Sequence, residues 1–488
     1  MTKITVNGRE VEADPTKPLI AACEGNGVEV PHYCYHAGLT PVGSCRICQV
    51  EVQEGGRPPR VVVACRTPVS EGMVVNTESE AAHETRRECL EFLLKDHPLD
   101  CPICDKAGEC TLQDYTYSEG QAAGQSKEPR QNFEKRKDLG EKIVLDQERC
   151  ILCSRCVRFF EEVTETPQLT VSGLGSRSRI ETFGDRPLVG NYQGNITDIC
   201  PVGALTLKSF RFQARVWNLI KKASTCGECS RGCSISVEVL RRGEVKRIRP
   251  RYNEQVNRWW MCDTGRFATD AANPAERVSA LQRGYSGLEP CELDDAVGVV
   301  RAAHGSYERH AIVASPWVTN EEGAKLAELA KRLGATPMFV SSPANDLKDE
   351  LLHTGDPCPN RRGLEALGFE AKTPEELAEL LAETETALLF GERVARLLGQ
   401  ETLDALPKSL RAFLFDDAPA AAPALRIVVG MANWVERKGT WTNIDGHEGK
   451  VQAARTAPSG IRQPLALLAD LLQTESVAET ANGGANAR

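Results

Sequence analysis

The sequence lacks the features of a membrane-spanning protein, of a secreted protein and of a nucleotide-binding protein. Its longest apolar runs, such as RVVVAC at residues 60–65, are far shorter than the roughly 18 residues that span a bilayer. The opening stretch MTKITVNGREVEAD has no apolar signal core, so we expect no secretion. The chain has no P-loop, no flavin motif and no G-x-G-x-x-G that opens a helix. By itself it is therefore not expected to oxidise a nicotinamide nucleotide.

An excess of basic charge is also missing. The formal net charge is −9, which argues against a general nucleic-acid binder. Hydrophobic residues make up 41% of the chain and charged residues 26%, as in ordinary soluble proteins. A chain of 488 residues is too long for one hydrophobic core, so we expect about three to five domains.

Cysteine, in contrast, is abundant, with 19 residues. The C-x-x-C clustering and the missing signal favour metal ligation in a reducing compartment over disulfides. The densest run is HPLDCPICDKAGEC, which places His97, Cys101, Cys104 and Cys110 at spacing H-x3-C-x2-C-x5-C. This spacing fits neither a helix face nor a strand face. A metal centre gives a role to all four residues.

Three further groups surround this run. They are Cys34, Cys45, Cys48 and Cys65 (C-x10-C-x2-C-x16-C), then Cys150, Cys153 and Cys156 followed after 43 residues by Cys200, then Cys226, Cys229, Cys233 and Cys262 (C-x2-C-x3-C-x28-C). In the first group, Gly38 and Gly43 would let backbone N–H groups approach bridging sulfides. Cys23, Cys89, Cys291 and Cys358 remain outside all groups. For Cys291 and Cys358 we expect a buried or free thiol.

Periodicity predicts several elements around these groups. Asn7-Gly8 between alternating residues predicts a hairpin, and helices are expected at 19–25 and 79–95, the second leading to His97. Residues 120–140 are expected to form a surface connector. HAIVASP, NEEGAKLAELAKRLGA and PMFVSSP predict one βαβ unit of a parallel sheet, and ALLFG, AFLFDD and RIVVGM predict further strands. The alanine-rich 418–424 is expected to be a linker and 476–488 a disordered tail.

The ordered series of four groups resembles the large iron–sulfur subunits (75-kDa or G type) of respiratory complex I, with a shortened molybdopterin-oxidoreductase-like C-terminal region. The resemblance implies a multidomain α+β and α/β chain. Its domains would be a β-grasp [2Fe–2S] ferredoxin type at 1–80, a His(Cys)3-ligated [4Fe–4S] domain at 81–120, a ferredoxin-like [4Fe–4S] domain at 121–215, a molybdopterin-oxidoreductase-type [4Fe–4S] domain at 219–275 and a shortened parallel α/β domain at 276–475.

The same resemblance implies the cofactors. The Cys34 group would hold one [2Fe–2S] cluster, and the His97, Cys150 and Cys226 groups one [4Fe–4S] cluster each. Cys200 is assigned to the Cys150 group by this resemblance and because His97 already completes the other set. Active formate dehydrogenases and nitrate reductases typically carry lysine where this chain has Thr264. No molybdopterin is therefore expected, and no catalytic residue.

By resemblance, the chain is a non-autonomous subunit of an ion-translocating oxidoreductase, NADH:quinone oxidoreductase. It would take single electrons from a flavin- and NADH-binding subunit and pass them through the two-iron, Cys150-group and His97-group clusters toward further iron–sulfur and quinone-side subunits. The Cys226 group would lie off this route. The expected place is the cytoplasmic face of a bacterial inner membrane, in a hetero-oligomer held there by membrane-arm subunits.

Three alternatives stay open at this point. The chain also suits an iron–sulfur subunit of an NAD-linked hydrogenase or of an NAD-dependent formate dehydrogenase. Detection of nickel would support the hydrogenase, and detection of molybdenum the formate dehydrogenase. A zinc-stapled scaffold without redox function is the third, and a colourless zinc protein would support it.

Overall fold

A computed structural model describes residues 1–473 of the chain. Helices and strands both occur along the whole described chain, which confirms the mixed α/β character expected. Two compact units are described separately below. The first unit consists of Met1–Lys221, Ser236–Thr269 and Glu350–Leu352, and the second of Lys222–Ile235, Asp270–Asp349 and the chain from His353 onward. The predicted tail at 476–488 lies outside the described residues.

The first unit opens with the predicted hairpin. Strands β1 (Thr2–Val6) and β2 (Arg9–Ala13) pair antiparallel, and both turn residues, Asn7 and Gly8, have positive φ. A two-residue turn of this kind requires such angles, which Asn-Gly tolerates well. Helix α1 (Leu19–Gly25) follows at the predicted place.

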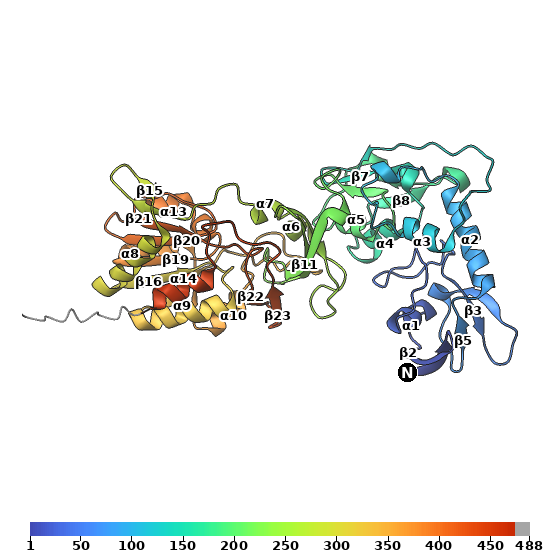
Figure 1. Cartoon of the computed structure of the whole chain (residues 1–488), viewed down its shortest axis with the longest axis horizontal. Helices are drawn as coiled ribbons and strands as arrows, with labels where there is room; N and C mark the ends of the chain where they lie inside the picture. Colours follow the sequence, from blue (N-terminus) through green and yellow to red (C-terminus); the bar gives the residue numbers. More distant parts are fainter. Residues whose placement is uncertain (474–488) are drawn as a thin grey trace, which may run out of the picture. The chain divides into compact units, whose positions relative to one another are not determined.

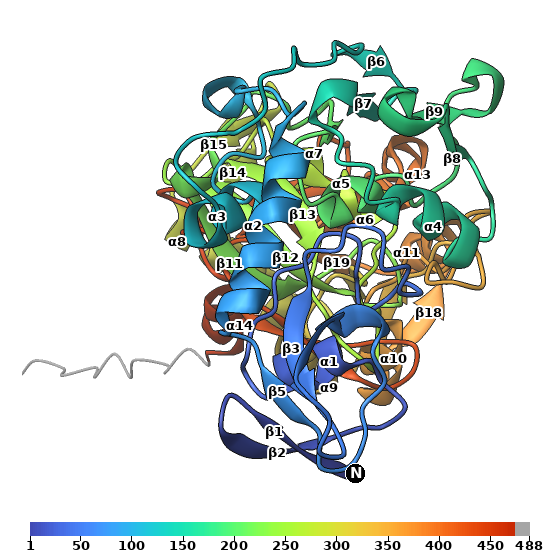
Figure 2. The ribbon, with the colours of Figure 1, turned by 90° about the vertical axis from the view of Figure 1, so that its right-hand side faces the viewer.

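Three later strands complete a five-stranded sheet in the order β2-β1-β5-β3-β4. They are β3 (Gln49–Gln53), β4 (Arg60–Val63) and β5 (Val74–Asn76). Within the sheet, only the pair of β1 and β5 is parallel. Leu19 and Ile20 of α1 are fully buried with the inward residues of this sheet in one apolar core. Figure 2 shows the helix beside the strands.

Helix α2 (Glu80–Leu94) confirms the second predicted helix. Ser79 caps its first turn by accepting from the Ala82 N–H. The buried Arg86 donates to the backbone carbonyls of Gln49 and Thr77, and so ties α2 to the sheet. The helix ends three residues before His97, whose direction it thereby fixes.

The rest of the first unit is built from short elements. They are α3 (Thr111–Glu119), β6 (Lys137–Asp138), β7 (Ile143–Leu145), α4 (Arg155–Glu162), β8 (Leu169–Ser172), β9 (Arg179–Thr182), α5 (Asn195–Ile199), β10 (Leu205–Leu207) and α6 (Asp263–Arg266). Strands β11 (Leu219–Thr225), β12 (Ser234–Leu240) and β13 (Val245–Pro250) form a separate three-stranded sheet.

The second unit is organised by an eight-stranded sheet in the order β15-β14-β21-β20-β19-β16-β17-β18. Its parallel strands are β16 (His310–Ala314), β17 (Pro337–Val340), β18 (Glu370–Lys372), β19 (Thr386–Phe390), β20 (Arg411–Asp416) and β21 (Leu425–Gly430). The predicted βαβ unit is β16, α9 (Asn320–Leu333) and β17. The sheet is not purely parallel, because β14 (Ala280–Arg283) and β15 (Leu288–Pro290) add an antiparallel edge.

Helices cover both faces of this sheet. One face buries apolar residues of α8 (Leu293–Ser306), α9 and α14 (Pro464–Leu472). The other buries those of α11 (Pro374–Ala382), α12 (Val394–Leu398) and α13 (Gln400–Ala405). Figure 1 shows the layers in the yellow to red part of the chain. Residues 418–424 are not a linker between domains: they connect the adjacent strands β20 and β21, and Ala422 and Ala424 are buried.

Among residues 1–473, no helix has both the length and the hydropathy needed to cross a bilayer.

Candidate metal centres

All 19 cysteines lie in the described part of the chain, and all are free thiols. The first group is gathered where the five-stranded sheet meets the long loop after α1. Cys48 precedes β3, and Cys65 lies in the single turn Ala64–Arg66 after β4. The Cys34 N–H donates to the Cys45 sulfur over 3.3 Å. The Cys45 and Cys65 thiols hydrogen-bond the Cys34 sulfur, and this lowers the pKa of Cys34. The structure thus brings all four thiols of the group together.

The two glycines of this loop differ in role. Gly43 has a φ of +69°, and a Cβ there would lie 2.9 Å from the Arg66 side chain, so a larger residue is strained. Gly38 instead packs against aromatic rings, because its Cβ would lie 2.8 Å from Trp259 and 2.9 Å from Trp260. This contact with the two tryptophans excludes a Cβ at Gly38 for a reason that the sequence did not show.

The second group borders a cavity of about 380 Å³, which His97, Cys101 and Cys110 line together. The Nδ1 atom of His97 is buried and has no hydrogen-bond partner. Burial, followed by the nearby Arg149 charge, lowers the pKa of His97 to about 4. The imidazole is therefore neutral at pH 7, and a neutral ring nitrogen is what a metal ligand requires.

Cys104, the fourth member of this set, contacts the Cys200 loop of the third group. A Cβ built on Gly203 would lie 2.1 Å from the Cys104 sulfur, so the two residues are in direct contact. Gly203 follows Cys200 by three positions. Lys106 makes a second link: it is buried, and its Nζ donates to the Thr197 carbonyl of α5 over 3.3 Å. Sequence reasoning missed both residues, although a lysine between two ligands was a visible signal.

The third group has the most complete geometry. Cys150, Cys153, Cys156 and Cys200 all line one small cavity, whose other walls include Ile180, Val202 and Leu205. Between the first three ligands, Leu152 and Ser154 have φ values of +52° and +57°. Such angles are uncommon for non-glycine residues, and strain of this kind often marks functional loops.

Burial raises the pKa of three thiols in this third group, to about 11 for Cys153 and further for Cys150 and Cys156. These three thiols therefore stay protonated at neutral pH. Binding of iron therefore has to displace their protons, as for other buried thiolate sites.

The fourth group is described in part within each unit. In the second unit Cys226, Cys229 and Cys233 are buried, and the Cys226 N–H donates to the Cys233 carbonyl over 2.8 Å. Burial raises the pKa of Cys229. In the first unit, Cys262 is the N-cap residue of α6.

Among residues 1–473, no three His, Cys, Asp or Glu side chains are arranged to hold a single metal ion. The orphaned His97 nitrogen and the cavity lined by four thiols fit iron–sulfur clusters as ligands. The mainly apolar walls of the Cys150-group cavity would exclude water from a cluster there.

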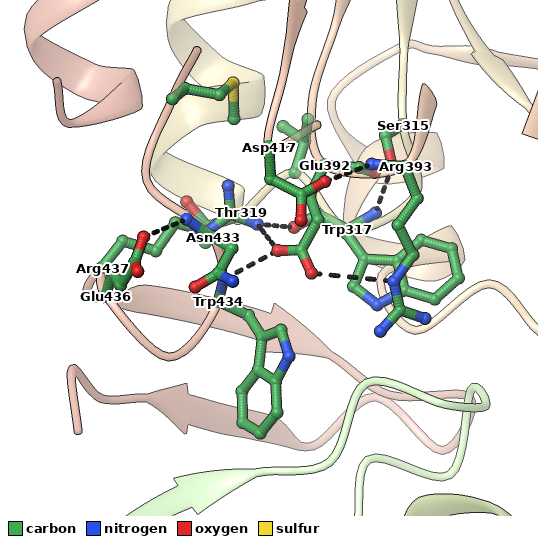
Figure 3. Close-up of polar contacts among 12 residues, drawn as sticks. Ser315, Trp317, Thr319, Glu392, Arg393, Asp417, Asn433, Trp434, Glu436 and Arg437 are labelled. Carbon is green, nitrogen blue, oxygen red and sulfur yellow. Dashed lines mark hydrogen bonds and ion pairs between the residues drawn. The ribbon is translucent and has the colours of Figure 1, made fainter. Parts of the chain in front are cut away.

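The second unit has a polar site of its own at the carboxyl ends of β16 and β19. The chain runs outward from these two strands in both directions, which makes this the topological switch point of the sheet, where open α/β sheets usually bind ligands. Figure 3 shows Glu392 there among Trp317, Arg393 and Trp434. Its carboxylate accepts a hydrogen bond from the backbone N–H of Trp434 over 2.7 Å.

Arg393 connects this site to the loop of the fourth group. Its guanidinium pairs with both oxygens of Glu228, at 2.8 and 3.2 Å, and lies 4.5 Å from the centre of the Trp317 ring. Gly227 packs against the same region, since a Cβ there would lie 2.9 Å from Trp317 and from Trp441. The side chains of the switch point thus support the loop between Cys226 and Cys229.

Glu392 should make the stability of the protein depend on pH. Burial, and then the charge of Asp417, raises the pKa of Glu392 from 4.5 to about 8, while Arg437 and Arg393 oppose the rise. The folded state therefore holds a proton that the unfolded chain releases, and stability falls as pH rises from about 4.5 through about 8. We expect Glu392→Gln to be more stable than the parent above pH 8, on the order of a few kcal/mol, with a smaller pH slope.

Thermal unfolding of both proteins between pH 6 and pH 9 measures this difference. Glu379→Gln, on the exposed face of α11, is the matched control and should follow the parent. Parallel curves for the parent and Glu392→Gln would contradict the prediction.

Comparison with known proteins supports the interpretation of the four groups. A family described as the 2Fe-2S iron-sulfur cluster binding domain matches residues 1–80, and the NADH-ubiquinone oxidoreductase-G iron-sulfur binding region matches residues 86–122. The ferredoxin-like domain of NADH-quinone oxidoreductase subunit 3 matches residues 140–206, and the molybdopterin oxidoreductase Fe4S4 domain residues 220–274. The chain therefore contains domains of the kinds that bind [2Fe–2S] and [4Fe–4S] clusters.

Relatives that align with about two thirds of this chain agree. The mitochondrial NADH-ubiquinone oxidoreductase 78 kDa subunit of Neurospora crassa is 37% identical over 70% of this chain, and the G-type NADH-quinone oxidoreductase subunit of Streptomyces coelicolor is 38% identical over 62%. The chain is homologous to the large iron–sulfur subunit of NADH:quinone oxidoreductase. It spans 46% and 36% of the length of these two relatives.

The G-type NADH-quinone oxidoreductase subunit of Mycobacterium bovis is 36% identical over 68% of this chain and is covered to 42%. All three relatives are subunits of a multi-subunit oxidoreductase. Among solved structures, a chain in the crystal structure of NAD+-reducing [NiFe]-hydrogenase in the H2-reduced state is 30% identical, with a TM-score of 0.38, 44% of this chain and 91% of that chain being covered.

Proposed function

We propose that this chain is the iron–sulfur electron-transfer subunit of the peripheral arm of NADH:quinone oxidoreductase. It receives single electrons from a flavin- and NADH-binding subunit and passes them toward the quinone-side subunits. The observation that carries the proposal is the third group, in which Cys150, Cys153, Cys156 and Cys200 line one apolar cavity. That arrangement gives four ligands to one centre and leaves no space for a substrate.

The proposed cofactors are one [2Fe–2S] cluster on the Cys34 group and one [4Fe–4S] cluster each on the His97, Cys150 and Cys226 groups, without molybdopterin. Such clusters supply one-electron transfer when bound. The thiols and His97 hold them, and the buried walls keep water away. The domain limits follow the groups, at 1–80, 81–120, 121–215, 219–275 and 276–475, with a β-grasp fold for the first.

The proposed order of electron transfer is the Cys34 group, the Cys150 group and then the His97 group. Contact between Cys104 and Gly203 supports the second step, because it joins the His97 loop to the Cys200 loop. Cys101 is exposed at the His97 cavity, which gives that group an outlet at the surface of the first unit. The Cys226 group supports its own domain, off this route.

The proposed place is the cytoplasmic face of a bacterial inner membrane, in a hetero-oligomer whose membrane-arm subunits provide the attachment. Nucleic acid has no part in this function.

The function is tested on the complex isolated from membranes under anaerobic conditions. Addition of NADH should produce the EPR signals of reduced clusters assigned to this chain, by comparison with a complex that lacks it. Addition of quinone should remove them. The proposal would be overturned if neither addition changed the EPR signals, or if the chain did not co-purify with a flavin-bearing subunit.

A further inference from the structure

Two arginines on α4 are buried and form no ion pair with a carboxylate, although the Arg155 charge acts on Glu24. Arg155 is 8% exposed and Arg158 is 5% exposed. Within residues 1–473, every hydrogen bond from their guanidinium groups ends on a backbone carbonyl or on the Ser154 hydroxyl, and neither forms an ion pair with Asp or Glu. A buried cation without an anionic partner is costly, so a counter-charge is required nearby.

The carbonyls that these arginines bind belong to two different groups of thiols. Arg158 donates to the carbonyl of Cys34 over 2.5 Å and to that of Cys153 over 3.4 Å, and its other nitrogen reaches the Thr40 carbonyl at 2.6 Å. Arg155 repeats the pattern one turn earlier, with the carbonyls of Tyr35 and Ile199 as acceptors. Each guanidinium therefore joins the Cys34 loop to the Cys150 group.

Arg155 also lines the same small cavity as the thiols of Cys150, Cys153, Cys156 and Cys200. As free thiols these groups are neutral, and they become negative when they bind iron. The missing counter-charge is then the charge of the loaded centres themselves.

We propose that Arg155 and Arg158 are shared counter-cations of the two-iron centre and the Cys150-group centre, and that Arg158 is the hydrogen-bonded link between them. This inference rests on the proposed function. A guanidinium stays protonated at all physiological pH values, so its charge is fixed. Because a fixed positive charge in a poorly solvated site favours the more negative, reduced form of a cluster, it raises the reduction potentials of both centres.

The test is an EPR-monitored redox titration of the full chain in its complex. Arg158→Met removes the charge and the hydrogen-bond fork, Arg158→Lys keeps the charge alone, and Arg186→Met removes an exposed arginine as the matched control. We expect Arg158→Met to shift the potentials of the two-iron and Cys150-group centres to more negative values together. The His97-group potential, and all potentials of Arg186→Met, should stay at parent values.

Unchanged potentials in Arg158→Met, or a shift of one centre alone, would overturn the inference. If Arg158→Met loses the clusters, Arg158→Lys decides: retention of both with potentials near the parent supports the counter-cation role, and loss of both contradicts it. A parent protein without iron would instead refute the proposed function, so the two failures are distinguishable.

Discussion

Replacing Cys156 with serine is expected to remove one four-iron centre from the protein. Serine has no thiol and so cannot supply the thiolate ligand that Cys156 would give to iron. The other cysteines that line the cavity are Cys150, Cys153 and Cys200, so no further thiol is available to replace it. Iron content should fall by about 4 of about 14 atoms per chain, with loss of the corresponding EPR signal. In the complex, reduction of the His97-group centre by NADH should be lost as well, because the proposed route passes through the Cys150 group.

Cys291→Ser is the control for this experiment. Cys291 is half-buried in the second unit and belongs to none of the four groups. This variant should keep the full iron content and all signals. Full iron content in Cys156→Ser would remove Cys156 from the ligand set and contradict the proposed centre.

Replacing His97 with cysteine is expected to keep a cluster in the second group but to lower its potential. Thiolate is anionic where the imidazole is neutral, so the loaded site becomes more negative and harder to reduce. By analogy with the effect of histidine ligands in Rieske centres, the shift should be on the order of 100 mV or more. EPR-monitored redox titration measures it.

The alanine variant of His97 separates ligation from simple packing. It leaves the position beside the cavity without any ligand, so the cluster should be lost or become labile to oxygen. An unchanged potential in His97→Cys together with a stable cluster in His97→Ala would show that another residue is the fourth ligand.

Local features of the fold were predictable from the sequence because they depend on neighbouring residues. Asn7-Gly8 meets the positive φ angles of a two-residue turn, and Ser79 caps α2 at the predicted position. The apolar runs of the C-terminal region became β19, β20 and β21. The grouping of Cys200 with the Cys150 run was predicted by resemblance and by counting ligands, and all four thiols line one cavity.

Contacts between distant segments were not predictable in this way. Arg158 is 124 residues from Cys34 in sequence, and nothing in the C-S-R-C-V-R stretch signals which carbonyls it binds. Nor did the sequence show that two tryptophans more than 200 positions later exclude a side chain at Gly38. The antiparallel edge strands β14 and β15 were missed because the periodicity of short strands does not show their direction.

Metal analysis of the full chain purified without oxygen tests the central claim most directly, together with EPR of the reduced protein. The account predicts about 14 iron atoms per chain, no molybdenum, and signals from both two-iron and four-iron clusters. Zinc in place of iron would show a structural scaffold, and stoichiometric molybdenum would show a pterin enzyme. Either result would contradict the electron-transfer function proposed for this chain.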